Sequence, residues 1–162
     1  TNPSEIVSQG WMTLMQWKFC HDISLQLFQM GQDISYTKGL ILVDTKYEFG
    51  KTVEGEIVLI DEIHTPDSSR YFYEKGYIER QIKGYRQKQL SKEFVREWLI
   101  ENNFKGLPGQ NLPKMDEQLI LSITKRYVEL FEKIMGKSFV RSSTENLLKR
   151  VNQNIVNYLE ST

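Results

Sequence analysis

Charged side chains interrupt two apolar segments, residues 41–50 and 55–62, in a pattern that restricts the folds open to this chain. Successive side chains of a strand point to opposite faces, so Asp44, Lys46 and Glu48 are expected to share one face. The apolar side chains at the intervening positions form the other face, which we expect to pack on a core. One strand therefore combines a core face with a charged face.

A hairpin with its turn at residues 51–54 would bring the charges of both segments together. If Phe49 lies opposite Glu56, then Asp61 comes opposite Asp44 on the charged face. Asp61 also ends an apolar run that is typical of a strand covered on both faces, where a charge is seldom unpaired. The pattern predicts that acidic residues from two strands converge.

Three carboxylates, Asp44, Glu48 and Asp61, would then lie beside Lys46. Alternating charges on one strand are usually a solvated sheet face, but like charges placed opposite one another destabilise a sheet. The cluster therefore favours a site over a plain surface. Carboxylate oxygens are ligands for hard divalent cations, and such a cation is often bound by the protein and a phosphate together.

The remaining chain predicts an α+β fold, with an antiparallel hairpin packed against several helices. Apolar residues recur at helical spacing in residues 13–35, 116–135 and 144–159, and a shorter helix follows residue 91. Four helix boundaries carry local signals, namely a capping box at Thr13 and Gln16, caps at Ser91 and Ser143, and a stop at Gly136. The polar residues 76–89 predict a loop that is a candidate lid.

The composition excludes several classes of function. With 162 residues the chain suffices for one domain with its own core. Lys+Arg and Asp+Glu both number 21, so no net field directs the chain to nucleic acid or to an anionic membrane. No apolar run approaches the roughly 20 residues that span a bilayer. The single Cys20 is typical of a reducing compartment, so we expect a cytoplasmic protein.

Residues 65–70 combine hydroxyl groups, backbone N–H groups and the guanidinium of Arg70, a set that suits a phosphate or a carboxylate. The same residues also suit an ordinary turn. Lys92 and Arg96 lie four apart near the start of a predicted helix, where an anionic ligand would offset their unfavourable interaction with the helix dipole. His64 is more typical of a structural histidine than of a ligand.

These segments resemble a known family. The sequences GLILVDTKYEFG at 39–50, IDE at 60–62, TPDSSR at 65–70 and SKEFVREWL at 91–99 are similar, in order and spacing, to the C-terminal half of the SAICAR synthetase family. The resemblance spans about residues 5–140. It implies an ATP-grasp-related fold with a substrate- and metal-binding domain at 1–140 and a helical extension at 141–162 packed on it.

The resemblance implies a ligase of purine biosynthesis that joins L-aspartate to carboxyaminoimidazole ribonucleotide, with ATP cleaved to ADP and phosphate and with Mg²⁺ as metal. It implies that Glu48 and Asp61 hold magnesium and that Lys46 contacts phosphoryl oxygens. It implies substrate contacts for Asp44, Ser69, Arg70, Lys92 and Arg96.

The N-terminal ATP lobe of the family has no counterpart in this sequence. We therefore expect the chain to be part of a longer enzyme, to be inactive alone and to have that lobe as its partner, and a homo-oligomer is one form the sequence allows. Two other classes stay open. One is a non-catalytic nucleotide-binding or assembly module. The other is a metal-dependent nuclease, although the acid and lysine order in residues 44–48 is reversed from the usual one.

Overall fold

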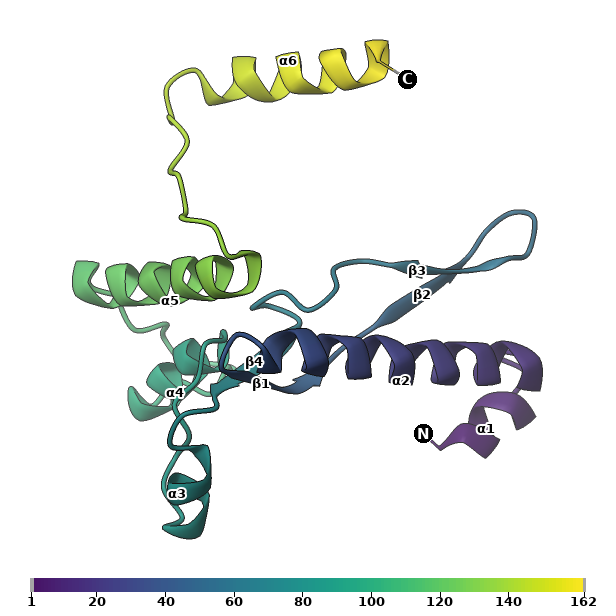
Figure 1. Ribbon diagram of the computed structural model, residues 1–162, viewed down its shortest axis with the longest axis horizontal. Coiled ribbons are helices and arrows are strands. Elements are labelled where there is room, and N and C mark those ends of the chain that lie inside the picture. The colour runs from purple at the N-terminus through teal and green to yellow at the C-terminus, as the bar shows by residue number, and fades with distance from the viewer. Residues whose placement is uncertain (1, 162) are drawn as a thin grey trace.

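The computed structural model describes residues 2–161, and these form an α+β fold with six helices and two small antiparallel sheets. The elements in chain order are α1 (Pro3–Ser8), α2 (Leu14–Tyr36), β1 (Leu40–Thr45), β2 (Glu48–Lys51), β3 (Ile57–Ile60), β4 (Ser69–Tyr73), α3 (Tyr77–Ile82), α4 (Glu93–Glu101), α5 (Glu117–Met135) and α6 (Leu147–Glu160). Figure 1 shows α2 lying along the β1–β4 sheet, with α3, α4 and α5 grouped at one end of it.

Local signals fix the ends of the two long helices. The Thr13 side chain accepts from the Gln16 N–H while the Gln16 side chain accepts from the Thr13 N–H, so the predicted capping box at the start of α2 is confirmed. Asp116 caps α5, and Gly136 ends it in the left-handed conformation that glycine adopts without strain. Each of these caps and stops involves residues only a few positions apart in the chain.

The core forms where α2 and α5 meet the β1–β4 sheet. Its fully buried apolar side chains are Leu40, Leu42, Tyr71, Leu90 and Leu130. The buried positions of β1 are thus the even ones, and the predicted apolar face at positions 41, 43 and 45 is wrong. The predicted stripe of α2 also differs, because Met30 and Ile34 are exposed while Gly31 and Ser35 are buried against the sheet.

The predicted single hairpin is wrong. The backbone leaves the strand conformation at residues 46–47, so β1 pairs with β4 while β2 pairs separately with β3. In the second pair Phe49 lies opposite Leu59 rather than Glu56. The β2–β3 pair forms an arm that extends away from the rest of the fold (Figure 1). Consequently Val58 and Ile60 are 38% and 43% exposed, and the prediction of a strand covered on both faces is also wrong.

A β-bulge at Val43 determines where the charged side of β1 points. Leu42 lies opposite Tyr71 but Asp44 lies opposite Arg70, so β1 advances by two residues where β4 advances by one. A regular strand would put Asp44 on the buried face of Leu42. The extra residue re-aims Asp44 outward, which is a common use of bulges next to functional sites.

Three smaller predictions also differ from the structure. Residues 76–89, expected as a loop, contain the helix α3. Ser91 donates to the Gln89 side chain instead of capping α4, which begins at Glu93 after an N-cap residue, Lys92, that makes no side-chain cap. Ser143 does not cap the last helix, because α6 begins after Asn146. Helix α1, whose capping box joins Asn2 and Glu5, was not anticipated.

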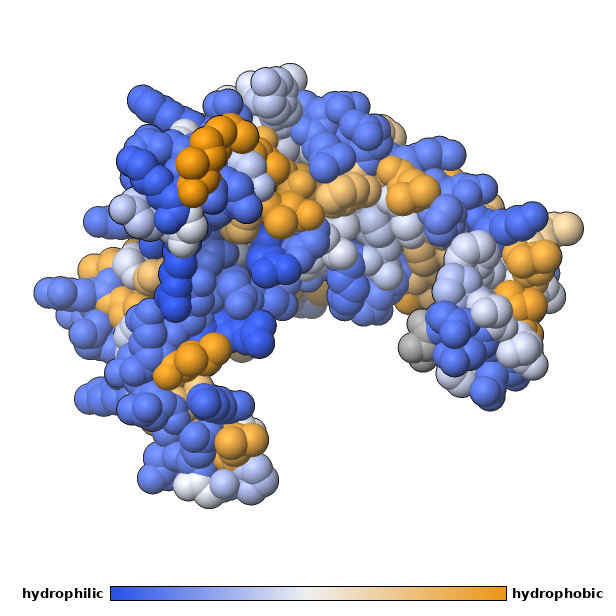
Figure 2. Space-filling view, turned by 90° about the horizontal axis from the view of Figure 1, so that it is seen from below, coloured by the Kyte–Doolittle hydropathy of each residue, from blue (hydrophilic) through white to orange (hydrophobic). Residues whose placement is uncertain are grey.

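Several apolar side chains stay exposed. Figure 1 shows α6 at the end of an extended segment, away from the sheets, and its Leu148 is 85% exposed. The packing of residues 141–162 on the rest of the chain therefore stays a prediction. Apolar patches also break up the polar surface in Figure 2, and Val53 at the tip of the arm is 99% exposed. Within residues 2–161 no helix has the length and apolar character needed to cross a bilayer.

Candidate functional site

An ion pair between β1 and β4 anchors the candidate site. Arg70 Nε donates to the two Asp44 carboxylate oxygens at 3.0 and 2.9 Å, and Arg70 Nη2 donates to Asp44 Oδ2. This contact lowers the pKa of Asp44 and raises that of Arg70. Both side chains are 45% exposed, so we expect the pair to contribute little stability. Its effect is to orient the guanidinium, which keeps further N–H groups for a ligand.

Thr65 organises the turn that leads into Arg70. Its hydroxyl accepts from the N–H groups of Asp67 and Ser68, and its carbonyl accepts from the Ser69 N–H at 2.9 Å. These N–H groups are therefore used inside the turn. The prediction that they are available to a phosphate is wrong, and side chains must supply the contacts to any anion at this turn.

A small pocket gathers all the residues that were predicted to bind substrate. We call this cavity of about 230 Å³ the Arg70 pocket; Asp67, Ser68 and Glu93 also line it. The predicted residues in its wall are Asp44, Ser69, Arg70, Lys92 and Arg96. They come from β1, from β4 and from the start of α4, so the fold brings together positions that are up to 52 residues apart.

The side chains of the Arg70 pocket differ in how far they are already engaged. Ser69 is only 4% exposed and shares a 2.8 Å hydrogen bond with Thr45. Arg96 donates to Glu93 at 3.3 Å, within one turn of α4. Lys92 has no side-chain partner among residues 2–161, and its backbone N–H donates to Pro66 at 3.3 Å, which fixes α4 to the turn. Lys92 and Arg96 therefore present positive charge to an anion.

A second cluster lies at the base of the β2–β3 arm. Glu48 begins β2 and lies opposite Ile60, so Asp61 follows directly at the same end of the arm. Lys46 Nζ donates to Glu48 Oε1 and, at 3.4 Å, to Asp61 Oδ2. The hydrogen bond that Lys46 donates to Glu48, with a further contribution from Asp61, raises the pKa of Lys46. Lys46, Glu48 and Asp61 thus come together as predicted.

The convergence of three carboxylates is not observed. Asp44 is bonded to Arg70, and no group of three or more His, Cys, Asp or Glu side chains within residues 2–161 is arranged to hold a metal. The two remaining carboxylates still fit magnesium, because Mg²⁺ commonly uses one or two protein carboxylates and completes its shell with water and substrate phosphate. We call Glu48 and Asp61 the carboxylate pair.

His64 ties the carboxylate pair to the core. Its Nε2 lies 2.5 Å from Tyr47 Oη, next to Glu48 in the chain, and its carbonyl accepts from Tyr71 Oη at 2.6 Å. Burial lowers the pKa of His64, which favours the neutral ring. A Cβ built on Gly31 of α2 would lie 2.4 Å from His64 Cε1, so α2 leaves no room beside the ring. This histidine is structural, as the sequence suggested.

Sequence reasoning missed the role of Tyr127. Its hydroxyl donates to Asp67 Oδ1 at 2.7 Å and so connects α5 to the wall of the Arg70 pocket. The spacing of apolar residues assigned Tyr127 only to the buried stripe of a helix. The available signal was its hydroxyl, because a tyrosine in an apolar stripe usually finds a hydrogen-bond partner.

Comparisons with known proteins agree on one family. The profile of the SAICAR synthetase family matches residues 1–110. A phosphoribosylaminoimidazole-succinocarboxamide synthase from Bacteroides thetaiotaomicron is 54% identical over 155 residues, which cover 96% of this chain and 49% of that protein. One from Flavobacterium psychrophilum is 49% identical and covers 98% of this chain and 50% of its own length. The chain spans about half the length of the curated relatives it matches.

Solved structures give the same result. A SAICAR synthase from Saccharomyces cerevisiae, solved in complex with SAICAR, aligns with a TM-score of 0.63 and 31% identity over 78% of this chain and 40% of that one. A SAICAR synthetase in complex with ADP aligns with a TM-score of 0.60 and 27% identity over 87% of this chain and 46% of that one.

Proposed function

The chain belongs to the SAICAR synthetase family, and we propose that it supplies the substrate- and metal-binding half of an ATP-dependent ligase. This enzyme would join L-aspartate to the carboxylate of carboxyaminoimidazole ribonucleotide, with ATP cleaved to ADP and phosphate. The observation that carries the proposal is the Arg70 pocket, in which one concavity unites the ion pair with two further cations. The yeast relative solved with SAICAR supports the same reaction.

In this proposal the Arg70 pocket binds the phosphorylated ribose of the ribonucleotide. Arg70, already oriented by Asp44, offers its remaining N–H groups to the phosphate, and Lys92 and Arg96 add charge from the start of α4. Asp44 retains acceptor capacity for ribose hydroxyls, and Ser69 contributes a hydroxyl at the wall. Asp44, Arg70 and Ser69 are held by hydrogen bonds before the substrate arrives, which lowers the entropy cost of binding.

The carboxylate pair would hold Mg²⁺, which when bound neutralises charge on phosphate oxygens. Lys46 lies within reach of both carboxylates and carries a charge that its neighbours stabilise. A carboxylate does not condense with an amine unassisted, so the γ-phosphoryl group of ATP first passes to the substrate carboxylate. The aspartate amine then displaces phosphate from that acyl phosphate. Lys46 would stabilise the negative charge that develops on the transferred oxygens.

A separate lobe would bind ATP and close over these two sites. The relatives are about twice as long as the aligned segment, and one relative was solved with ADP. Exposed apolar side chains on the arm and on α2, such as Val53 and Met15, offer surface to such a lobe. The free Cys20 suits a reducing compartment, and we propose the cytoplasm.

The test replaces each member of the carboxylate pair in a protein that joins this chain to an ATP lobe. Glu48→Gln and Asp61→Asn keep the side-chain size, so we expect an unchanged circular dichroism spectrum and a loss of ADP formation of at least about a hundredfold. Glu56→Gln, on the exposed turn of the arm, serves as the control and should retain activity. Wild-type turnover in Glu48→Gln or Asp61→Asn would overturn the metal assignment.

A further inference from the structure

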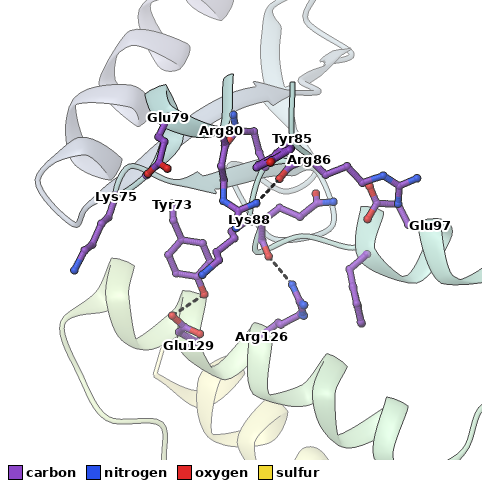
Figure 3. Close-up of a pocket in the computed structure, with 14 residues that line it drawn as sticks. Tyr73, Lys75, Glu79, Arg80, Tyr85, Arg86, Lys88, Glu97, Arg126 and Glu129 are labelled. Atoms are coloured by element: carbon purple, nitrogen blue, oxygen red, sulfur yellow. Dashed lines mark hydrogen bonds between the residues drawn. The ribbon is translucent and has the colours of Figure 1, made fainter. Parts of the chain in front are cut away.

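A larger pocket is lined by other residues of α4 than those of the Arg70 pocket. Glu93 and Arg96 line the Arg70 pocket, whereas Phe94 and Glu97 line this second cavity of about 1100 Å³. We call it the α3–α4 pocket, and its remaining wall comes from the end of β4, from α3 with the segments before and after it, and from α5 (Figure 3). None of the residues assigned to the ligase reaction lines it.

Five cations face this cavity, and four of them are not neutralised by a carboxylate. Arg80 donates to the carbonyl of Arg86 at 2.9 Å and Arg126 to the carbonyl of Gln89 at 2.7 Å, so both keep their positive charge. The side chains of Lys75 and Lys88 have no hydrogen-bond or ion-pair partner among residues 2–161, and Figure 3 shows Lys88 amid the lining residues. Arg86, the fifth, pairs with Glu101 outside the pocket.

The acidic side chains of the wall do not cancel this charge. Glu79 is bonded to Lys83 at 2.6 Å, and Lys83 lies outside the pocket. Glu129 accepts from Tyr73 at 2.8 Å and lies 3.9 Å from Lys133 of the same helix, also outside the wall. Within residues 2–161 only Glu97 faces the cavity without a partner. Lysines from outside the wall thus pair with Glu79 and Glu129, and the five cations of the wall outnumber its three carboxylates.

Aromatic rings line the same cavity. Tyr85, in the segment after α3, is 61% exposed, and Tyr73 and Phe94 lie deeper. The Arg126 guanidinium already stacks 3.8 Å from the centre of the Phe94 ring, which leaves Tyr85 as the accessible ring. The volume lies slightly above the usual range for small-molecule sites and far exceeds that of a lone phosphate. The cavity therefore suits an anion that also carries a flat ring.

We propose that the α3–α4 pocket binds a nucleoside monophosphate at a site distinct from the ligase site. The phosphate lies against Lys75, Arg80 and Lys88, and the base stacks on Tyr85. This proposal goes beyond the ligase function and does not depend on it, because the α3–α4 pocket and the Arg70 pocket share no lining residue.

The test is a calorimetric titration of the 162-residue chain with AMP, in an Arg70→Ala background that disables the Arg70 pocket. AMP should bind, while adenosine and inorganic phosphate, which each lack half of the ligand, should bind at least about tenfold more weakly. The double variant Lys75→Ala/Lys88→Ala should lose about tenfold in AMP affinity. Glu97→Gln should bind AMP more tightly, because it removes the unpaired negative charge.

A matched control removes the same charge elsewhere. Lys137→Ala/Lys149→Ala, two exposed lysines beyond α5, should keep the AMP affinity within about twofold. Tyr85→Leu should weaken AMP without changing the affinity for inorganic phosphate, which distinguishes a nucleotide site from a simple phosphate site. No AMP binding, or equal losses in the pocket variant and the control, would overturn the proposal. Neither result would bear on the activity of the carboxylate pair.

Discussion

Tyr127 Oη donates a 2.7 Å hydrogen bond to Asp67 Oδ1 and so joins α5 to the turn that precedes Arg70. Burial, together with the Asp67 carboxylate, raises the pKa of Tyr127 to about 12, so the hydroxyl stays a donor at neutral pH. The family profile matches residues 1–110, and α5 lies beyond it. A helix outside the matched segment therefore helps to shape the Arg70 pocket.

Tyr127→Phe should loosen the wall of the Arg70 pocket. Loss of one partly exposed hydrogen bond should lower the free energy of unfolding by about 1 kcal/mol. In a protein that joins this chain to an ATP lobe, the KM for the ribonucleotide should rise several-fold while the KM for ATP stays unchanged. Tyr73→Phe is the matched control, because its hydroxyl donates to Glu129 away from the turn. Equal KM changes in both variants would contradict a positioning role for Tyr127.

Substitutions of Arg70 should separate charge from geometry. Arg70→Ala should weaken the ribonucleotide by about 2 kcal/mol or more, because a charge-assisted contact to phosphate is lost. Arg70→Lys should recover only part of this, since an ammonium cannot bind Asp44 and a phosphate through one planar fork. Isothermal titration with ribonucleotide and with ATP measures both effects. An unchanged ribonucleotide affinity in Arg70→Ala would refute the assignment.

Gly31→Ala should destabilise the fold even though alanine is the better helix former. In an open helix position this change stabilises by about 1 kcal/mol. Here the new Cβ would lie 2.4 Å from His64 Cε1 and 2.7 Å from Leu42 Cδ2, so we expect a net loss of about 1–3 kcal/mol. Urea denaturation measures it. Gln26→Ala, on the exposed side of α2, should change stability by less than about 0.5 kcal/mol.

The partly buried His64 should make the stability fall in mild acid. Burial lowers its pKa below the ordinary 6.5, so the unfolded chain takes up a proton at a higher pH than the folded chain does. Protonation then favours unfolding as the pH drops below that ordinary value. His64→Gln should reduce the difference in unfolding free energy between about pH 7.5 and about pH 5.5. His21→Gln, with a half-exposed side chain, should keep it, and equal pH dependence in both variants would speak against this explanation.

Much of the helical architecture was predictable because its signals are local. The capping box at Thr13 and Gln16, the cap at Asp116 and the stop at Gly136 each close hydrogen bonds within one turn of helix. The caps at Ser91 and Ser143 failed for the complementary reason. Ser91 is buried and its hydroxyl donates to Gln89, so the hydroxyl does not cap the helix.

The candidate site was predictable in its membership but not in its geometry. Motif order placed Asp44 and Arg70 in one family pattern, whereas strand periodicity placed Asp44 opposite Asp61. The break in the strand at residues 46–47 explains the difference, because it gives β1 and β2 separate partners, and the bulge at Val43 then turns Asp44 outward beside Arg70. Neither motif order nor strand periodicity predicted the role of Tyr127, because its hydrogen-bond partner Asp67 lies 60 residues away.

The sequence by itself determined the ends of the two long helices, the α+β class and the family, all of which depend on nearby residues or on motif order. Only the tertiary structure decided which strands pair, which face of β1 is buried and how α4 and α5 complete the Arg70 pocket. The physical reason is that backbone hydrogen bonds are much the same for any strand partner. Register and partner are therefore selected by the burial of Leu40, Leu42 and Tyr71 against distant elements.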